Sequence, residues 1–145
     1  MSRPVYLIIY HSPIFAAHWA LWIPYYEQEV AGNSGKIINV QGSPSEGFLH
    51  EFERNYDIAA ETRRHSIRLL SWLDSKYIID TTGDYSVDST AIDFLECSAL
   101  TIQAPGPSLR SAGEHTWLRQ FVSILVENGT FSEDALVELD NAPKN

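Results

Sequence analysis

Cysteine is almost absent from this sequence of 145 residues, in which Cys97 is the single example. One thiol cannot form an internal disulfide, and it excludes a metal site built from several cysteines. Basic residues are also scarce: 10 Lys and Arg stand against 19 Asp and Glu, and the formal net charge is −9. Because nucleic acids and anionic membranes are bound by basic faces, this balance argues against both as partners.

Long apolar runs are missing as well. No run approaches the ~20 residues that a membrane span requires, so we expect no membrane partner. Met1 to Pro4 leads directly into a strand-like segment without the charged and apolar pattern of a targeting leader. The composition is otherwise globular, with 44% apolar and 12% aromatic residues. We therefore expect one cytoplasmic domain over residues 1–140, followed by a frayed tail at 141–145.

The first half of the chain predicts β-strands. Five segments are rich in β-branched and aromatic residues and are separated by proline, glycine and polar turns: 5–10, 16–24, 36–42, 48–57 and 64–70. The first three of them fit a meander. The fourth has mixed polarity on both of its sides, which favours a position at the edge of the sheet.

The hydrophobic period changes after residue 88. Ile92, Leu95, Ala99 and Ile102 recur at helical spacing, and Thr90 with Asp93 resembles a capping box. Cys97 lies in this helix, where we expect a small buried side chain. A second helix follows from 114 to the stop signal Asn128-Gly129, and a short third helix ends near 139. Strands first and helices last predict an α+β fold, with a mostly antiparallel sheet of about five strands and two to three C-terminal helices packed on one face.

His18 lies within the apolar segment 16–24. In a strand, His18, Ala20 and Trp22 would face one side of the sheet, while Trp19 and Leu21 would face the other. The small alanines beside the imidazole leave room next to it. Two interpretations remain open: a core histidine whose nitrogens are satisfied by neighbours, or a histidine that faces a binding site.

Two further polar residues stand where they are unexpected. Asn39 lies in the middle of the next strand, and His115 lies in the first turn of the second helix. A helix start carries a partial positive charge, which disfavours an imidazolium, so His115 is expected to be neutral at pH 7.

The segments around these three residues carry a resemblance. Ala17-His18-Trp19-Ala20-Leu21-Trp22, Lys36-Ile37-Ile38-Asn39-Val40 and His115-Thr116-Trp117-Leu118-Arg119-Gln120-Phe121 resemble the circularly permuted NlpC/P60-like branch of papain-type proteins. The lecithin:retinol acyltransferase-like and PPPDE-like domains belong to that branch. The segments 6–10 and 48–57 also resemble small fungal proteins of unsettled role. The resemblance implies a papain-like pocket with a histidine on one strand, a polar residue on the next and a cysteine at a helix start.

This sequence departs from that pattern because His115, and not a cysteine, stands at the helix start. We therefore expect His18 and His115 to act as an acid and base pair, with Asn39 or a backbone carbonyl fixing a tautomer. Trp19, Trp22, Trp117 and Tyr10 are the candidate substrate-binding residues, with core packing as the alternative for the tryptophans. The predicted function is cyclisation, isomerisation or hydrolysis of an apolar or aromatic metabolite, and the resemblance implies tailoring in a fungal biosynthetic pathway. The alternative is a non-catalytic binding or scaffolding module derived from such a hydrolase.

The other histidines do not suggest a metal site. His11, His50 and His65 could be grouped with His18, but no two of them have the spacing of a known metal-binding motif. We expect no metal and no cofactor. The pair Arg63-Arg64 is sufficient for one carboxylate or phosphate. The expected partner is a small-molecule substrate, and a homodimer is an open option.

Overall fold

The computed structural model describes residues 2–25, 33–107 and 113–145. The strands are β1 (Ser2–Tyr10), β2 (His18–Pro24), β3 (Ser34–Ser43), β4 (Gly47–Asp57), β5 (His65–Asp74) and β6 (Ser86–Asp88). The α-helices are α1 (Phe94–Leu100), α2 (Gly113–Glu127) and α3 (Asp134–Asp140), and the short 3-10 helices Ile58–Ala60 and Ser75–Tyr77 lie between strands. The chain is thus an α+β protein in which the strands precede the α-helices.

All strand pairs in the six-stranded sheet are antiparallel, and the order is β5-β1-β2-β3-β4-β6. The predicted meander of the first three strands is confirmed. The sheet contains one strand more than expected, because Ser86–Asp88 pairs with residues 52–54 of β4. The expectation that 48–57 forms an edge is therefore wrong for residues 52–54, because β4 lies between β3 and β6 and β6 pairs with these three residues.

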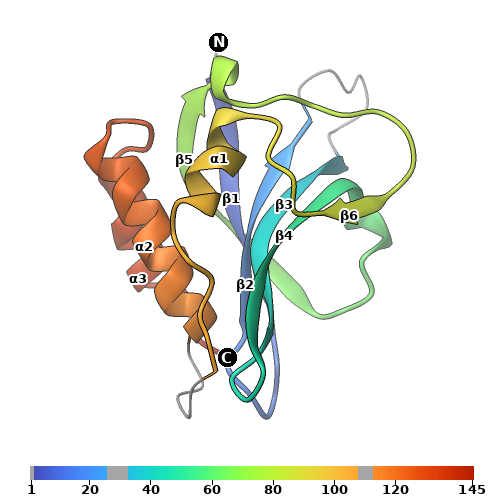
Figure 1. Ribbon diagram of the computed structural model, residues 1–145, viewed down its shortest axis with the longest axis vertical. Coiled ribbons are helices and arrows are strands. Elements are labelled where there is room, and N and C mark those ends of the chain that lie inside the picture. The colour runs from blue at the N-terminus through green and yellow to red at the C-terminus, as the bar shows by residue number, and fades with distance from the viewer. Residues whose placement is uncertain (1, 26–32, 108–112) are drawn as a thin grey trace.

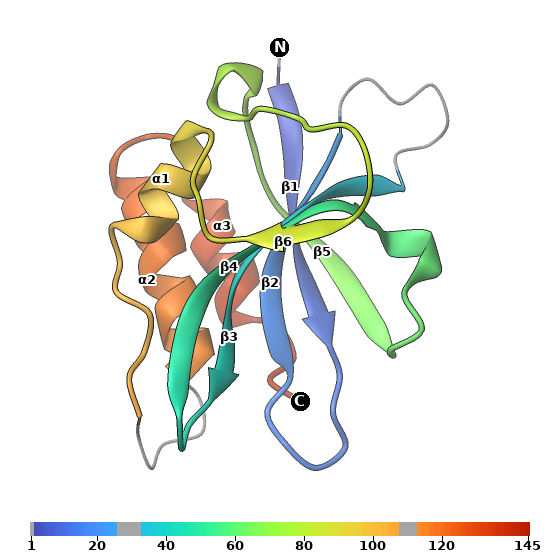
Figure 2. The same ribbon diagram turned by 45° about the vertical axis from the view of Figure 1, so that its right-hand side comes forward.

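The two faces of the sheet bury separate apolar clusters. The larger one lies between the sheet and the helices and includes Trp19, Leu21 and Phe121. The smaller one contains no helical residue and is formed by Ile8, Tyr10, Ala20, Trp22, Ile37 and Tyr56. Figures 1 and 2 both show the three α-helices on one side of the sheet. The predicted alternation along β2 is confirmed, since Trp19 and Leu21 belong to the first cluster and Ala20 and Trp22 to the second.

Helix α1 begins two residues later than its apolar pattern suggested. Asp93 is its N-cap, and the Asp93 carboxylate accepts the backbone N–H of Glu96 at 2.8 Å. The expectation that Cys97 is buried is wrong, because its side chain is exposed. Leu95 and Ala99 are the buried apolar positions of α1, and Cys97 lies two residues from each, on the opposite side of the helix.

The last residues, which the sequence suggests to fray, lie against the start of β2. The backbone N–H of Ala17 donates to the carbonyl of Lys144 at 2.8 Å, and the Trp19 indole donates to the carbonyl of Pro143 at 3.0 Å. Ala142 is buried in the larger cluster. These contacts bring the C-terminus to the end of the sheet at which β1 ends and β2 begins (Figure 1). None of the helices in the described ranges has both the length and the apolar character needed to cross a membrane.

Candidate functional site

The candidate site lies at the end of the sheet near the C-terminus. His18 is the first residue of β2, Asn39 lies on β3, and Glu114 is the second residue of α2. The antiparallel pairing of β2 with β3 brings the first two together, and the packing of α2 against both strands adds the third. Residues that are up to 96 positions apart in the sequence therefore meet around one imidazole.

Both ring nitrogens of His18 have partners. Nδ1 lies 2.6 Å from Oε2 of Glu114, so an Nδ1–H donates to the carboxylate. Nε2 lies 2.9 Å from the side-chain amide nitrogen of Asn39 and 3.3 Å from that of Gln41. With amide nitrogens as the neighbours of Nε2, this pattern fits the tautomer that has its proton on Nδ1 and a lone pair on Nε2. The Oδ1 atom of Asn39 is buried and has no hydrogen-bond partner among the described residues.

Aromatic and charged groups border the imidazole on the side of the smaller apolar cluster. Tyr10 stacks on His18 with ring centroids 5.6 Å apart, and the Arg63 guanidinium lies 4.0 Å from the centroid of the Tyr10 ring. The hydroxyl of Tyr10 donates to that of Tyr56 at 3.2 Å, and burial raises the pKa of Tyr10 to about 12. Tyr10 therefore stays neutral, and its ring contacts both the His18 imidazole and the Arg63 guanidinium.

A cavity of about 430 Å³ opens beside His18. Its apolar lining comes from Phe15, Ala16, Pro44 and Phe48, and its polar lining from His18, Gln41, Ser43, Arg63 and Glu114, with Gly42 between. A Cβ atom at Gly42 would lie only 2.0 Å from the carbonyl oxygen of Gly47, so no larger residue fits this part of the wall. The volume and mixed lining are typical of a site for a small organic molecule.

His115 lies next to Glu114 but does not belong to the lining of this cavity. Its Nε2–H donates to the carbonyl of Ala17 at 2.5 Å, and its ring stacks on Trp19 at a centroid distance of 3.9 Å. Burial lowers the pKa of His115, and the nearby Lys144 and His18 add to that effect. The expected neutral state agrees with this direction, and the ring holds the residues on either side of His18.

The structure brings together only part of the predicted residue set. His18 and Asn39 are in direct contact, and Tyr10 stacks on His18. Trp19, Trp22 and Trp117 are buried in the two apolar clusters, and none of them is among the residues that line the cavity. The tryptophans therefore pack the core around the site, which was the alternative reading of their pattern.

Two residues of the site were missed in the sequence. Glu114 reads as an ordinary first-turn acid that complements the helix dipole, yet its carboxylate contacts His18. Gln41 reads as the polar end of a strand, yet it contacts His18 and lines the cavity. The available signal was the period of two from Asn39 to Gln41, which places both amides on one face of β3.

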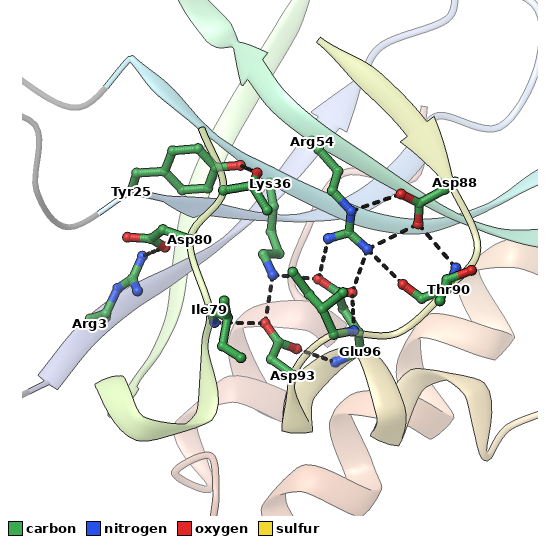
Figure 3. A network of polar contacts seen from close by, with 12 residues as sticks. Arg3, Tyr25, Lys36, Arg54, Ile79, Asp80, Asp88, Thr90, Asp93 and Glu96 are labelled. Carbon is green, nitrogen blue, oxygen red and sulfur yellow. Dashed lines mark hydrogen bonds and ion pairs between the residues drawn. The ribbon is translucent and has the colours of Figure 1, made fainter. Parts of the chain in front are cut away.

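A second polar cluster lies beside the start of α1, at the end of the sheet away from the C-terminus (Figure 1), and Figure 3 shows its side chains. Nζ of Lys36 donates to Asp93 at 2.6 Å and also to Glu96, while the Arg54 guanidinium contacts Glu96 at 2.7 and 2.8 Å. Arg54 also binds Asp88 through two contacts of 3.0 Å. Burial alone would raise the pKa of Glu96, but the hydrogen bonds from Arg54 and Lys36 outweigh it and lower that pKa. We define this set of Lys36, Arg54, Asp88, Asp93 and Glu96 as the ion network.

Within residues 2–25, 33–107 and 113–145, no group of three or more His, Cys, Asp and Glu side chains is arranged to hold a metal ion. Cys97 lies on α1, at the end of the sheet that carries the ion network, and does not line the cavity. The site around His18 therefore offers an imidazole, a carboxylate and amides as its chemical groups.

Comparison with known proteins gives a family without an assigned activity. Residues 5–132 match the model of a family of unknown function (DUF6540). Searches of the curated proteins and of the solved structures each returned no match. Because the match spans most of the chain, including His18, Asn39 and Glu114, the chain belongs to this family of unknown function, DUF6540.

Proposed function

We propose that this protein is a cofactor-free enzyme that transfers a proton on a small, apolar or aromatic molecule, with His18 as the acid–base group. The observation that carries the proposal is the position of His18: it lines the 430 Å³ cavity while Glu114 holds its Nδ1 at 2.6 Å. A carboxylate on one ring nitrogen fixes the tautomer and leaves the other nitrogen as the base.

The environment of His18 accommodates both of its protonation states. In the neutral state, Nε2 accepts a hydrogen bond from the Asn39 amide at 2.9 Å. After Nε2 gains a proton, a rotation of the Asn39 amide would bring Oδ1, which is without a partner among the residues described, to the same place, where it accepts the new N–H. Glu114 at the same time stabilises the imidazolium. A histidine that keeps its hydrogen bonds in both states suits a group that gains and loses a proton in each turnover.

Gln41 gives a substrate a way to reach Nε2. Its contact with Nε2 is the longer one, at 3.3 Å, and Gln41 itself lines the cavity. Since Asn39 is buried and Gln41 is partly exposed, a bound substrate approaches Nε2 from the side of the Gln41 amide and displaces it. Because Nε2 has one lone pair, the Asn39 N–H must also turn away as the proton arrives.

The positions of His18 on β2, Asn39 on β3 and the start of α2 support a proposed likeness to papain-type pockets, for which the resemblance implies a histidine on one strand, a polar residue on the next and a helix start. In place of a nucleophilic cysteine, the residue at the helix start that contacts His18 is Glu114. A carboxylate orients and stabilises an imidazole but is a weak nucleophile, so the arrangement favours proton transfer over thiol acyl transfer.

A generic proton-transfer probe tests this proposal. 5-Nitro-1,2-benzisoxazole is aromatic and uncharged; loss of its ring proton to a base breaks the N–O bond and releases a coloured nitrophenolate. We expect wild-type protein to accelerate this reaction, and His18→Gln to lose about 10²-fold or more of the acceleration. His50→Gln, whose imidazole instead contacts the carbonyl of Ile102 at 2.7 Å, is the matched control. Equal rates for His18→Gln and wild type would exclude His18 as the base.

A binding or scaffolding module is the second candidate, and one observation favours it. Ile14 and Phe15, between β1 and β2, are 81% and 74% exposed, and Phe15 reaches the cavity. Exposed apolar side chains at the rim of a cavity are typical of binding surfaces. Saturable binding of the probe without any dependence of its turnover on His18 would support the module and not the enzyme.

A further inference from the structure

We infer that the cavity beside His18 selects an uncharged ligand with an apolar body and a carbonyl oxygen, and that Arg63 binds this oxygen. The inference rests on the proposed function only in that it concerns the same cavity. It assigns a substrate class, which the acid–base argument alone leaves open.

The charges around the cavity argue against a charged ligand. Arg63 is the one Lys or Arg among the described residues that line it, and Glu114 is the one acid. Arg63 is already neutralised by Glu61, whose two carboxylate oxygens accept Nη2–H and Nε–H at 2.7 and 3.0 Å. An anion bound at Arg63 would therefore approach Glu61, and a cation at Glu114 would compete with His18.

The sequence analysis treated Arg63-Arg64 as a pair for one carboxylate or phosphate. The structure shows that the acid partner of Arg63 is supplied by the chain itself, two residues away. The same contact strongly affects Glu61, because the hydrogen bonds from Arg63 lower its pKa to about 2. The ion pair thus persists at all ordinary pH values, and Arg63 offers hydrogen-bond donors with little net charge.

Those donors remain available to a ligand. An arginine has five N–H groups, and Glu61 takes one from Nε and one from Nη2. Nη1 donates to none of the described residues, although Arg63 lines the cavity. Phe15, Pro44 and Phe48 provide apolar contact on the other parts of the wall. A neutral acceptor such as a ketone, ester or lactone oxygen, attached to an apolar body, satisfies both kinds of surface.

Three probes of one shape separate the alternatives: acetophenone carries a carbonyl, ethylbenzene carries no acceptor, and benzoate carries a charge. Each is titrated into isotope-labelled protein while the side-chain N–H signals of Arg63 and the ring signals of His18 are followed by NMR. We expect acetophenone to shift both sets of signals and to bind about tenfold more tightly than ethylbenzene, the effect of one hydrogen bond. Benzoate should bind more weakly than acetophenone.

Two variants test the role of Arg63 directly. Arg63→Met keeps the length of the side chain without its donors, and should lower acetophenone affinity about tenfold, to the level of ethylbenzene. Glu61→Gln leaves Arg63 with an uncompensated charge, and should raise benzoate affinity about threefold while leaving acetophenone binding unchanged. Arg119→Met is the control, because Arg119 is an exposed arginine on α2 that pairs with Asp140 on α3.

Tighter binding of benzoate than of acetophenone to the wild type would overturn the inference. So would unchanged acetophenone binding in Arg63→Met, or failure of all three probes to perturb His18. These outcomes are independent of the benzisoxazole rates: a carbonyl-selective cavity without His18-dependent turnover would retain the inference and remove the proposed enzyme. His18-dependent turnover with no selectivity for the carbonyl would retain the proposed enzyme and remove the inference.

Discussion

The two ends of the sheet both gather charged and polar side chains, but they use them differently. At one end, Lys36 is fully buried and Arg54 is 5% exposed, and every carboxylate in contact with them also accepts a backbone N–H. At the other end, the polar groups around His18 border a cavity, and one buried amide oxygen, Oδ1 of Asn39, has no partner in the part of the chain that the structure describes. In the first arrangement each charged side chain is paired with an opposite charge of the chain itself, whereas the second borders a cavity that has room for another molecule.

This difference separates a structural cluster from a candidate site. Buried charges cost solvation, and they are retained where geometry and further hydrogen bonds compensate for that loss. The ion network meets this condition by joining β3, β4 and α1, so it fixes the helix on the sheet (Figure 3). Around His18, the contact of Gln41 with Nε2 is long, at 3.3 Å, and Oδ1 of Asn39 accepts no hydrogen bond from the described residues. Such unsatisfied hydrogen-bonding groups are expected where a ligand binds.

Breaking the ion network should have the largest effect on stability. Lys36→Met leaves Asp93 and Glu96 buried with fewer cations, so the free energy of unfolding should fall by about 3–5 kcal/mol. Urea denaturation measures this change. Arg119→Met, which breaks an exposed pair with Asp140, should remain close to wild type. A Lys36→Met protein as stable as wild type would show that the network is not structural.

Substitution of His18 or Glu114, at the other end of the sheet, should reduce the rate of proton transfer and leave the free energy of unfolding largely unchanged. His18→Gln should lose about 10²–10⁴-fold in turnover of the benzisoxazole probe. Glu114→Gln should lose less, because an amide still accepts the Nδ1–H but stabilises an imidazolium poorly. The double variant should be no slower than His18→Gln alone, since Glu114 acts through the imidazole. Additive losses in the double variant would assign Glu114 a role of its own.

The comparison also shows which parts of the structure the sequence could predict. The period of two along 18–23 predicted which residues face each cluster, because successive side chains of a strand point to opposite faces of the sheet. The ion network was not predicted, since Lys36 looks like an exposed strand start and Glu96 like a surface helix residue until β3, β4 and α1 are packed together. Cys97 was misplaced for a local reason: its two-residue offset from Leu95 already placed it on the outer side of the helix. His18 and Asn39 were selected as candidates because polar residues inside apolar strands are rare, whereas Glu114 is an ordinary residue at a helix start.

A smaller effect should distinguish His115 from His18. Burial lowers the pKa of His115 below its ordinary value of 6.5, so the unfolded chain binds the proton more readily than the folded one. His115 therefore reduces stability progressively as the pH falls from about 7 through 6.5 and on towards its folded pKa. Glu51 acts in the opposite direction, because burial and Glu53 raise its pKa and folding then favours its protonated form.

The His115→Gln variant separates the contribution of His115 to the pH dependence of stability from that of Glu51. Its amide can donate to the carbonyl of Ala17 at any pH, so the variant should lose less stability than wild type between about pH 7 and pH 5. Urea denaturation at several pH values measures both slopes. Turnover of the benzisoxazole probe should fall by less in His115→Gln than in His18→Gln, because His115 holds Ala17 and does not line the cavity. Equal losses of turnover would return His115 to the acid–base pair that the sequence suggested.

The smallest effect is expected at Cys97. The thiol is exposed on α1, at the end of the sheet that carries the ion network, so iodoacetamide should modify it in the folded protein. Modification should change neither probe turnover nor acetophenone binding, since Cys97 does not line the cavity. Mass spectrometry of the native protein measures the extent of reaction, and Cys97→Ser serves as the unreactive control. If modified protein loses turnover while Cys97→Ser keeps it, the two ends of the sheet are coupled through α1. If Cys97→Ser itself loses turnover without losing stability, a thiol mechanism replaces the one proposed for His18.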